Sequence, residues 1–359
     1  MMKYFFIGVL LLHGLIHLMG FVKAFDLAPI QGLTQDITRT VGLLWLLAAL
    51  LLGATAVAFA VNAKWWWLLA LTAAALSQFL IFTVWQDAKF GALANLFIVL
   101  VALLNLTDAN FARTYQQDVQ TNLERTRSLS AEILTEADLA PLPPPVQQYL
   151  RYVGAVGQPK VVSMRAVLSG EMRSPGKSYF PLTAEQYNFY DEPTRLFFMQ
   201  GRMFGVTVPG YHRYQGDQAT MDVRPFGLLP IVKQAGDVMF TADTVTLFND
   251  MCLLAPATLI DRRITWETID EMTVQATFTN QGVTISAILY FNEAGQLINF
   301  VSEDRWDITT MRQYPFSTPV SQYRNLNGFN LPTYGELIWH YPEGDFIYGK
   351  LEVNDVFYN

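Results

Sequence analysis

Two histidines near the N-terminus have the spacing of a pair on one helical face. His13 and His17 lie four residues apart in an apolar run, so a helix places one imidazole above the other. Inside a membrane such a pair is a candidate for binding a metal or haem, or for relaying protons. A closed metal site needs more ligands, which Asp87, Gln78 or Asn95 would have to supply. We favour the alternative, in which each imidazole hydrogen-bonds to a neighbouring helix and stabilises the bundle, and we expect no metal and no cofactor.

Asp87 and Lys89 are a second pair of polar residues that the sequence places close to a membrane. They lie in the segment Trp85-Gln86-Asp87-Ala88-Lys89-Phe90-Gly91, between two apolar runs. Their opposite charges favour an ion pair at the membrane interface, with an anchoring role. His13, His17, Asp87 and Lys89 are therefore the candidate intramembrane polar site.

No known catalytic motif is present. The sequence has no G-x-S-x-G, G-x-x-x-x-G-K-S/T, G-x-G-x-x-G or H-E-x-x-H pattern. His212 and His340 are flanked by aromatic residues, which is more typical of packing than of a general base. Cys252, the only cysteine, lies in an apolar run and reads as a buried thiol. We assign no catalytic residue and expect a protein that is not an enzyme.

The elements that carry the histidines are membrane spans. Four apolar stretches occur at Tyr4 to Val22, Leu43 to Val61, Trp65 to Val84 and Ala92 to Leu106. A helix needs about 20 apolar residues to cross a bilayer, and about 17 suffice. The fourth reaches that length only with its flanking residues. Short connections predict an antiparallel bundle of four transmembrane helices.

Charge divides the chain at about Leu106. The first 106 residues carry five basic and three acidic side chains, whereas the remainder carries 19 basic and 28 acidic ones. The acidic remainder has no basic stripe and so argues against a nucleic-acid partner. Basic residues near the spans are evenly shared between the two sides; Arg125, Arg127 and the Met-Met-Lys start favour cytoplasmic termini. We therefore predict a multi-pass protein of the cell (inner) membrane with its soluble domain in the cytoplasm.

Beyond the spans the sequence predicts a helical linker and then a β-rich domain. Residues 107–140 are polar with helical spacing and indicate one or two surface helices. Prolines from Pro141 to Pro145 mark a boundary and suit the start of a short helix, Val146 to Val153. The predicted domains are 1–106 (four transmembrane helices), 107–140 (polar helical linker) and 141–359 (soluble domain).

The soluble domain is predicted to be α+β, with a strongly curved antiparallel sheet or open β-barrel and a covering helix. About ten short alternating runs are separated by turn signals. The expected helix, Asp243 to Ile260, is broken near Pro256. Strands such as Leu196-Phe197-Phe198-Met199 are more apolar than a half-solvated sheet needs. This favours either a cavity for a hydrophobic ligand or an ordinary core beneath a helix.

The motifs resemble those of a bacterial family of membrane-anchored proteins classed as a domain of unknown function. The resemblance rests on the segments His13 to Phe21, Trp85 to Gly91, Phe180 to Tyr187 and Gly328 to Phe346. It covers nearly the whole chain and implies no activity. The ending, Asn327-Gly328-Phe329-Asn330-Leu331-Pro332 and two strands, is also similar to the closing hairpin of the lipoprotein carriers LolA and LolB. That likeness implies an unclosed barrel that binds acyl chains; a fold alone does not fix a function.

The sequence thus favours a membrane-tethered, non-catalytic protein that binds a hydrophobic ligand, a lipid or an acyl group. Two alternatives belong to other classes: a membrane redox or transport bundle that uses His13 and His17, and a structural partner in an envelope assembly. Membrane lipid is the expected partner. The ligand-binding residues and the oligomeric state do not follow from the sequence.

Overall fold

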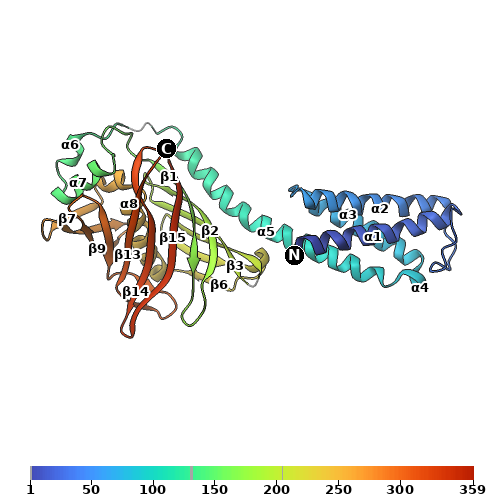
Figure 1. Ribbon diagram of the computed structural model, residues 1–359. Helices are drawn as coiled ribbons and strands as arrows, with labels where there is room; N and C mark the ends of the chain where they lie inside the picture. Colours follow the sequence, from blue (N-terminus) through green and yellow to red (C-terminus); the bar gives the residue numbers. More distant parts are fainter. Residues whose placement is uncertain (1, 130–131, 204) are drawn as a thin grey trace. The chain divides into compact units, whose positions relative to one another are not determined.

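The computed structural model describes residues 2–129, 132–203 and 205–359. The chain forms two compact units, Met1–Asn110 and Phe111–Asn359 (Figure 1). The first unit contains helices only, and the second contains every strand.

The helices are α1 (Met2–Ala24), α2 (Arg39–Ala60), α3 (Trp66–Thr83), α4 (Trp85–Ala88), α5 (Gly91–Thr126), α6 (Glu136–Leu139), α7 (Pro144–Tyr152) and α8 (Asp237–Leu253), with short 3₁₀ segments η1 (Pro225–Gly227) and η2 (Pro256–Ile260). The strands are β1 (Ser163–Met172), β2 (Phe180–Phe189), β3 (Thr194–Met203), β4 (Val206–Gln215), β5 (Gln218–Val223), β6 (Val232–Ala235), β7 (Ile264–Thr268), β8 (Thr273–Asn280), β9 (Val283–Phe291), β10 (Leu297–Ser302), β11 (Trp306–Asp307), β12 (Arg312–Gln313), β13 (Phe316–Leu326), β14 (Phe329–Tyr341) and β15 (Gly344–Tyr358).

The helical unit is built as the apolar runs predict. Helices α1, α2, α3 and α5 are each long and apolar enough to cross a membrane, and their composition indicates a membrane protein. Small residues let the helices approach closely: a β-carbon on Gly20 would lie 2.2 Å from the Trp45 ring. Large apolar side chains such as Leu12, Leu50 and Phe82 remain exposed on the outside of the unit, as lipid-facing side chains are.

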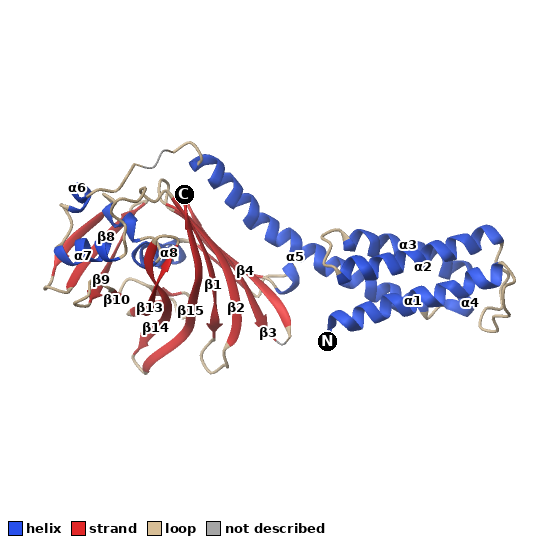
Figure 2. Cartoon of the chain, turned by 45° about the horizontal axis from the view of Figure 1, so that its top comes forward, coloured by secondary structure: helices blue, strands red, loops and turns tan. Residues whose placement is uncertain are grey.

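The second unit is dominated by one antiparallel sheet of 13 strands. Their order is β6-β5-β4-β3-β2-β1-β15-β14-β13-β10-β9-β8-β7, so β6 and β7 are free edges and the sheet does not close into a barrel (Figure 2). The alternation seen in the sequence sets the register: Val274, Ala276 and Phe278 of β8 are buried, and the residues between them are not. The turn Asn327-Gly328 has positive φ at both residues (48° and 95°), which is the conformation that a two-residue hairpin needs.

Helix α8 packs on the concave face of this sheet (Figure 2). Phe248 of α8 is fully buried, stacks on Phe278 with ring centroids 5.4 Å apart and meets Phe300 edge-on at 5.9 Å. The helix ends at Leu253, and η2 begins at Pro256. The predicted fold class, a helical bundle followed by a strongly curved antiparallel sheet with a covering helix, is confirmed.

The expected linker differs from the observed structure. Helix α5 continues without interruption from Gly91 to Thr126, so the polar helix is a prolongation of the fourth apolar helix. It is also not wholly a surface helix, because Phe111, Tyr115 and Val119 are buried against the sheet. Strand β6 and the two-residue strands β11 and β12 were not predicted, because runs this short carry little alternating signal.

Candidate functional site

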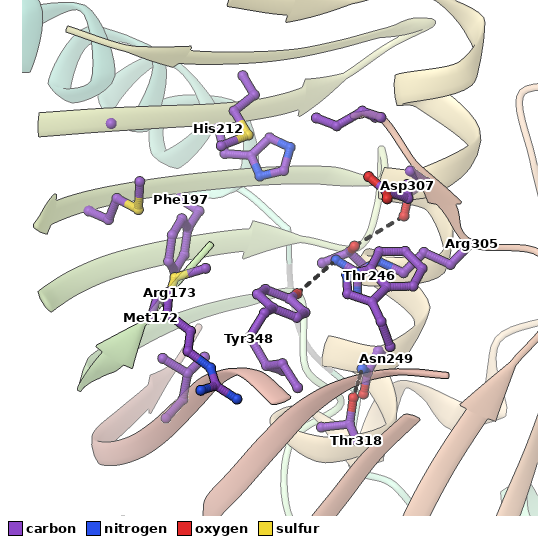
Figure 3. Close-up of a pocket in the computed structure, with 18 of the residues that line it drawn as sticks. Met172, Arg173, Phe197, His212, Thr246, Asn249, Arg305, Asp307, Thr318 and Tyr348 are labelled. Atoms are coloured by element: carbon purple, nitrogen blue, oxygen red, sulfur yellow. Dashed lines mark hydrogen bonds between the residues drawn. The ribbon is translucent and has the colours of Figure 1, made fainter. Parts of the chain in front are cut away.

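The concave face of the sheet encloses a cavity of about 1190 Å³ between α8 and the strands (Figure 3). The walls come from β1 to β6 and from β13 to β15, whereas the side of α8 that carries Phe248 packs on β8 and β10. The volume exceeds the roughly 300–1,000 Å³ of ordinary small-molecule pockets. The half of the concave face that α8 leaves uncovered is therefore hollow.

The cavity wall is mainly apolar, because alternate residues of each strand face it. Strand β3 shows the principle. Phe197 and Met199 line the cavity, whereas Leu196 and Phe198 lie on the opposite face and pack against α5. The apolar run in β3 thus contacts two different partners, one on each side of the sheet. Other apolar residues that line the cavity include Leu168, Met172, Met203, Val208, Met221, Val223, Ile231, Met239, Val320, Leu337, Leu351 and Val353.

A stripe of polar side chains on α8 interrupts this apolar wall. Asp243, Thr246, Asn249 and Asp250 share one face of the helix and line the cavity. The Asp243 carboxylate lies 2.8 Å from Nε2 of His212, and the Asp243 side chain is only 3% exposed.

The last two residues of the stripe, Asn249 and Asp250, are hydrogen-bonded to the strands. Asp250 accepts a hydrogen bond of 2.7 Å from Nε of Arg195 and another of 2.7 Å from Gln186. Asn249 donates to Oγ1 of Thr318 at 2.7 Å (Figure 3). Its own amide oxygen is buried and has no hydrogen-bond partner within the described part of the chain.

Two arginines stack on aromatic rings at the end of the cavity formed by β11 and the β14–β15 turn. The guanidinium of Arg305 lies 3.8 Å from the Phe316 ring centre and donates to the hydroxyl of Tyr348 at 3.2 Å. The guanidinium of Arg173 lies between Tyr179 and Phe346, at 4.5 and 5.0 Å. Among the described residues neither arginine has a carboxylate within ion-pair distance, so both charges are offset only by aromatic faces and hydrogen bonds.

The side chains of this site are suited to holding a ligand. Within residues 2–129, 132–203 and 205–359 no group of three or more histidine, cysteine or acidic side chains is placed to hold a metal. Burial and the neighbouring carboxylate of Asp307 raise the pKa of Tyr341, so its phenol stays neutral and donates to that carboxylate at 3.1 Å. The site offers a large apolar surface with a few convergent polar groups, as ligand-binding cavities do.

The four residues of the predicted intramembrane site do not come together. His13 and His17 are buried in one network: Nε2 of His13 lies 3.0 Å from Oγ of Ser77 and 2.9 Å from Oδ1 of Asn95, and Nε2 of His17 lies 2.7 Å from the same Oγ. Asn95 also donates to Gln78 at 3.1 Å. Each imidazole thus hydrogen-bonds to neighbouring helices.

Asp87 lies in α4, apart from the histidines, and binds the loop before α2. It accepts hydrogen bonds from the backbone N–H groups of Thr34 and Gln35 at 2.6 and 3.0 Å, and from the Thr34 hydroxyl at 2.8 Å. The Gln35 N–H, followed by Thr34, lowers the pKa of the Asp87 carboxyl. No ion pair joins Asp87 to Lys89 among the described residues, and the Lys89 ammonium lies 5.5 Å from the Phe90 ring centre. The structure therefore gives Asp87 a loop-binding role in place of the expected pairing.

Sequence reasoning did not find the polar residues that line the cavity. The sequence predicts a packing role for His212 and gives no role to Asp243, which contacts it. One signal was available: four polar residues at helical spacing, Asp243 to Asp250, occur in a helix that is otherwise almost wholly apolar and buried. The partners on β2, β3 and β4 come from distant parts of the chain and carry no such signal.

The comparison with protein families identifies the soluble domain. A family model matches residues 132–351, which is more than half of the chain and includes the cavity. The chain belongs to DUF6544, a family of unknown function. The DUF6544 match begins after the apolar helices, so it covers the sheet domain and not the helical unit.

Other comparisons add little to the DUF6544 assignment. No curated protein matches the chain. Among solved structures, a LolA superfamily protein from Nitrosomonas europaea matches with a TM-score of 0.35 and 11% identity, over 60% of this chain and 93% of that one. The TM-score is low, and this likeness carries no information about a ligand of the DUF6544 chain.

Proposed function

We propose that the sheet domain binds a hydrophobic ligand, a lipid or an acyl group, and that the four apolar helices tether it to a membrane. The observation that carries the proposal is the cavity of about 1190 Å³ with its apolar wall. Filled with water alone, it would hold about 40 molecules at roughly 30 Å³ each. An apolar ligand that replaced this water would gain about 25 cal/mol for each Å² of apolar surface that it covered.

The polar stripe on α8 favours an amphiphile, a ligand that has a polar group as well as an apolar chain. A pure hydrocarbon against the stripe would remove water from these polar side chains and offer no hydrogen bond in return, which costs about 1–3 kcal/mol for each polar group left without a partner. A lipid with a polar group, such as an ester, a hydroxyl or a phosphate, offers hydrogen-bonding atoms together with a chain. The stripe, together with Arg173 and Arg305, supplies sites for such atoms.

Native mass spectrometry of the full-length protein, released from mild detergent, tests the proposal. We expect copurifying lipid in the wild type, and uptake of a fluorescent fatty acid or phospholipid after delipidation. A protein that carried no lipid and took up neither probe would contradict the proposal.

Two matched variants on α8 locate the binding. Thr246 lines the cavity and Thr241 does not, yet each hydroxyl donates to the carbonyl four residues earlier at 3.1 Å. Thr246→Trp should block the cavity and reduce probe uptake at least tenfold, whereas Thr241→Trp should leave uptake unchanged. Equal effects of the two variants would place the lipid elsewhere.

A further inference from the structure

The segment between β5 and β6 exposes large apolar side chains. Leu228, Leu229 and Ile231 are 46%, 81% and 62% exposed. Burial of each would stabilise a soluble protein by about 1.5–3 kcal/mol, so their exposure together at one loop marks an interaction surface. We call residues 225–231 the apolar loop.

The backbone holds the apolar loop in one shape. Phe226 and Gly227 have φ of 56° and 64°, which turns the chain sharply. At the base of the loop the N–H of Ile231 donates to the carbonyl of Val223 at 2.9 Å, and the N–H of Arg224 donates to the carbonyl of Pro209 at 3.0 Å. The exposed side chains are thus carried by a loop fixed at its base to the sheet.

The apolar loop is continuous with the cavity. Ile231 and the next residue, Val232, line the cavity. A ligand chain that left the cavity at this side would pass directly onto the apolar surface of the loop.

The covalent chain limits the distance between the base of the apolar loop and the fourth apolar run. The guanidinium of Arg224, at the base of the loop, lies 5.2 Å from the ring centre of Phe111, which itself packs on Phe198 at 6.0 Å. Phe111 is the fifth residue after Leu106, the last residue of the fourth apolar run. Because a chain extends at most about 3.6 Å per residue, Phe111 stays within roughly 18 Å of the end of that run at any angle between the two units.

We propose that the apolar loop inserts into the surface of the bilayer that the helices cross, and that it forms the portal through which lipid enters and leaves the cavity. The portal role rests on the proposed lipid binding, whereas the insertion rests only on the proposed membrane tether. A lipid surface is the occupant that the tether favours, since the covalent chain holds Phe111, which contacts the base of the loop, within roughly 18 Å of the end of the fourth apolar run. Lys233, exposed two residues beyond Ile231, suits the phosphate groups of that surface.

Site-specific fluorescence tests the insertion in the full-length protein. Leu229→Cys is labelled with an environment-sensitive fluorophore after reconstitution into phosphatidylcholine nanodiscs. The only native thiol, Cys252, is fully buried, and burial raises its pKa, so labelling is confined to the introduced cysteine. Nanodiscs with doxyl-labelled acyl chains then report contact with lipid.

Asp217→Cys provides the matched control. Asp217 is exposed in the β4–β5 turn, two residues beyond Gln215, whose amide donates to Asn122 of α5 at 3.4 Å. Asn122 lies 11 residues beyond Phe111, or about 16 Å farther along the helix. We expect the label at position 229 to shift to shorter wavelength and to be quenched several-fold more by doxyl lipid than the label at position 217. Equal quenching would overturn the insertion, as would a position-229 label that is shielded from water but not quenched by lipid, because a protein partner or a second copy would then cover the loop.

A second variant distinguishes lipid entry through the apolar loop from lipid binding in the cavity. Leu229→Asp changes a side chain that makes little contact with the fold, so the protein should still fold. We expect the initial rate of uptake of a fluorescent phospholipid to fall about tenfold with an unchanged final stoichiometry. An unchanged rate would overturn the portal role. A chain that inserts the loop but takes up no probe would refute the proposed function and leave the insertion standing.

Discussion

Two neighbouring residues of β3 test the hollow interior of the sheet domain. Leu196 is fully buried beneath α5, whereas Phe197 faces the cavity and is partly exposed. Leu196→Ala removes three carbon atoms, worth about 2.4 kcal/mol at roughly 0.8 kcal/mol per buried group. The void that remains in a packed interface raises the loss of stability to about 4 kcal/mol.

Phe197→Ala removes a larger side chain and should nevertheless cost less. Its ring borders space that is already open, so the truncation creates no closed void. The main losses are part of its burial and its contact with the guanidinium of Arg195, 4.8 Å from the ring centre, together about 1–2 kcal/mol. A lipid that lies against this ring should bind about tenfold more weakly, which corresponds to about 1.4 kcal/mol.

Hydrogen exchange of the β3 amides in the full-length protein measures the stability of this region, and titration with a fluorescent lipid measures binding. We expect Leu196→Ala to lose more stability with unchanged affinity, and Phe197→Ala to lose less stability with reduced affinity. If Phe197→Ala were as destabilising as Leu196→Ala, Phe197 would lie in a closed core and the cavity would not exist as described.

Three further outcomes follow from contacts elsewhere in the chain. Asp118→Asn should destabilise the packing of α5 on β4 by about 1–2 kcal/mol, because the Asp118 carboxylate accepts hydrogen bonds of 2.7 Å from Tyr211 and 3.2 Å from Arg213. Faster hydrogen exchange in residues 111–126 would show this. Hydrogen bonds from Lys160 and from Thr135 lower the pKa of Asp138 from 3.8 to about 2. The carboxylate therefore stabilises the fold above about pH 4, and this contribution is lost as the pH falls towards 2. Acid unfolding of Asp138→Asn should lack that part of the pH dependence. Ser77→Ala should weaken the helical unit by about 0.6–2 kcal/mol, measured by unfolding in detergent, and an unchanged stability would argue against a structural role for the histidine network.

The sequence by itself determined the membrane helices and the class of the second domain. Both depend on local patterns: about 20 uncharged apolar residues are more stable in hydrocarbon than in water, and a two-residue alternation forces one face of a strand inward. The turn Asn327-Gly328 and the break before Pro256 are local signals of the same kind. They predicted a curved antiparallel sheet with a covering helix before any contact was known.

Only the tertiary structure decided where the apolar residues go. The residues from Leu196 to Met199 point alternately to the two faces of the sheet. The sequence of this run does not indicate that α5 covers one face while the other face lines the cavity. Likewise, His212 meets Asp243 only because β4 and α8 pack across the cavity. Such contacts join residues that are far apart in the chain, and the cavity is space that α8 does not occupy. Neither feature produces a local periodic pattern in the sequence.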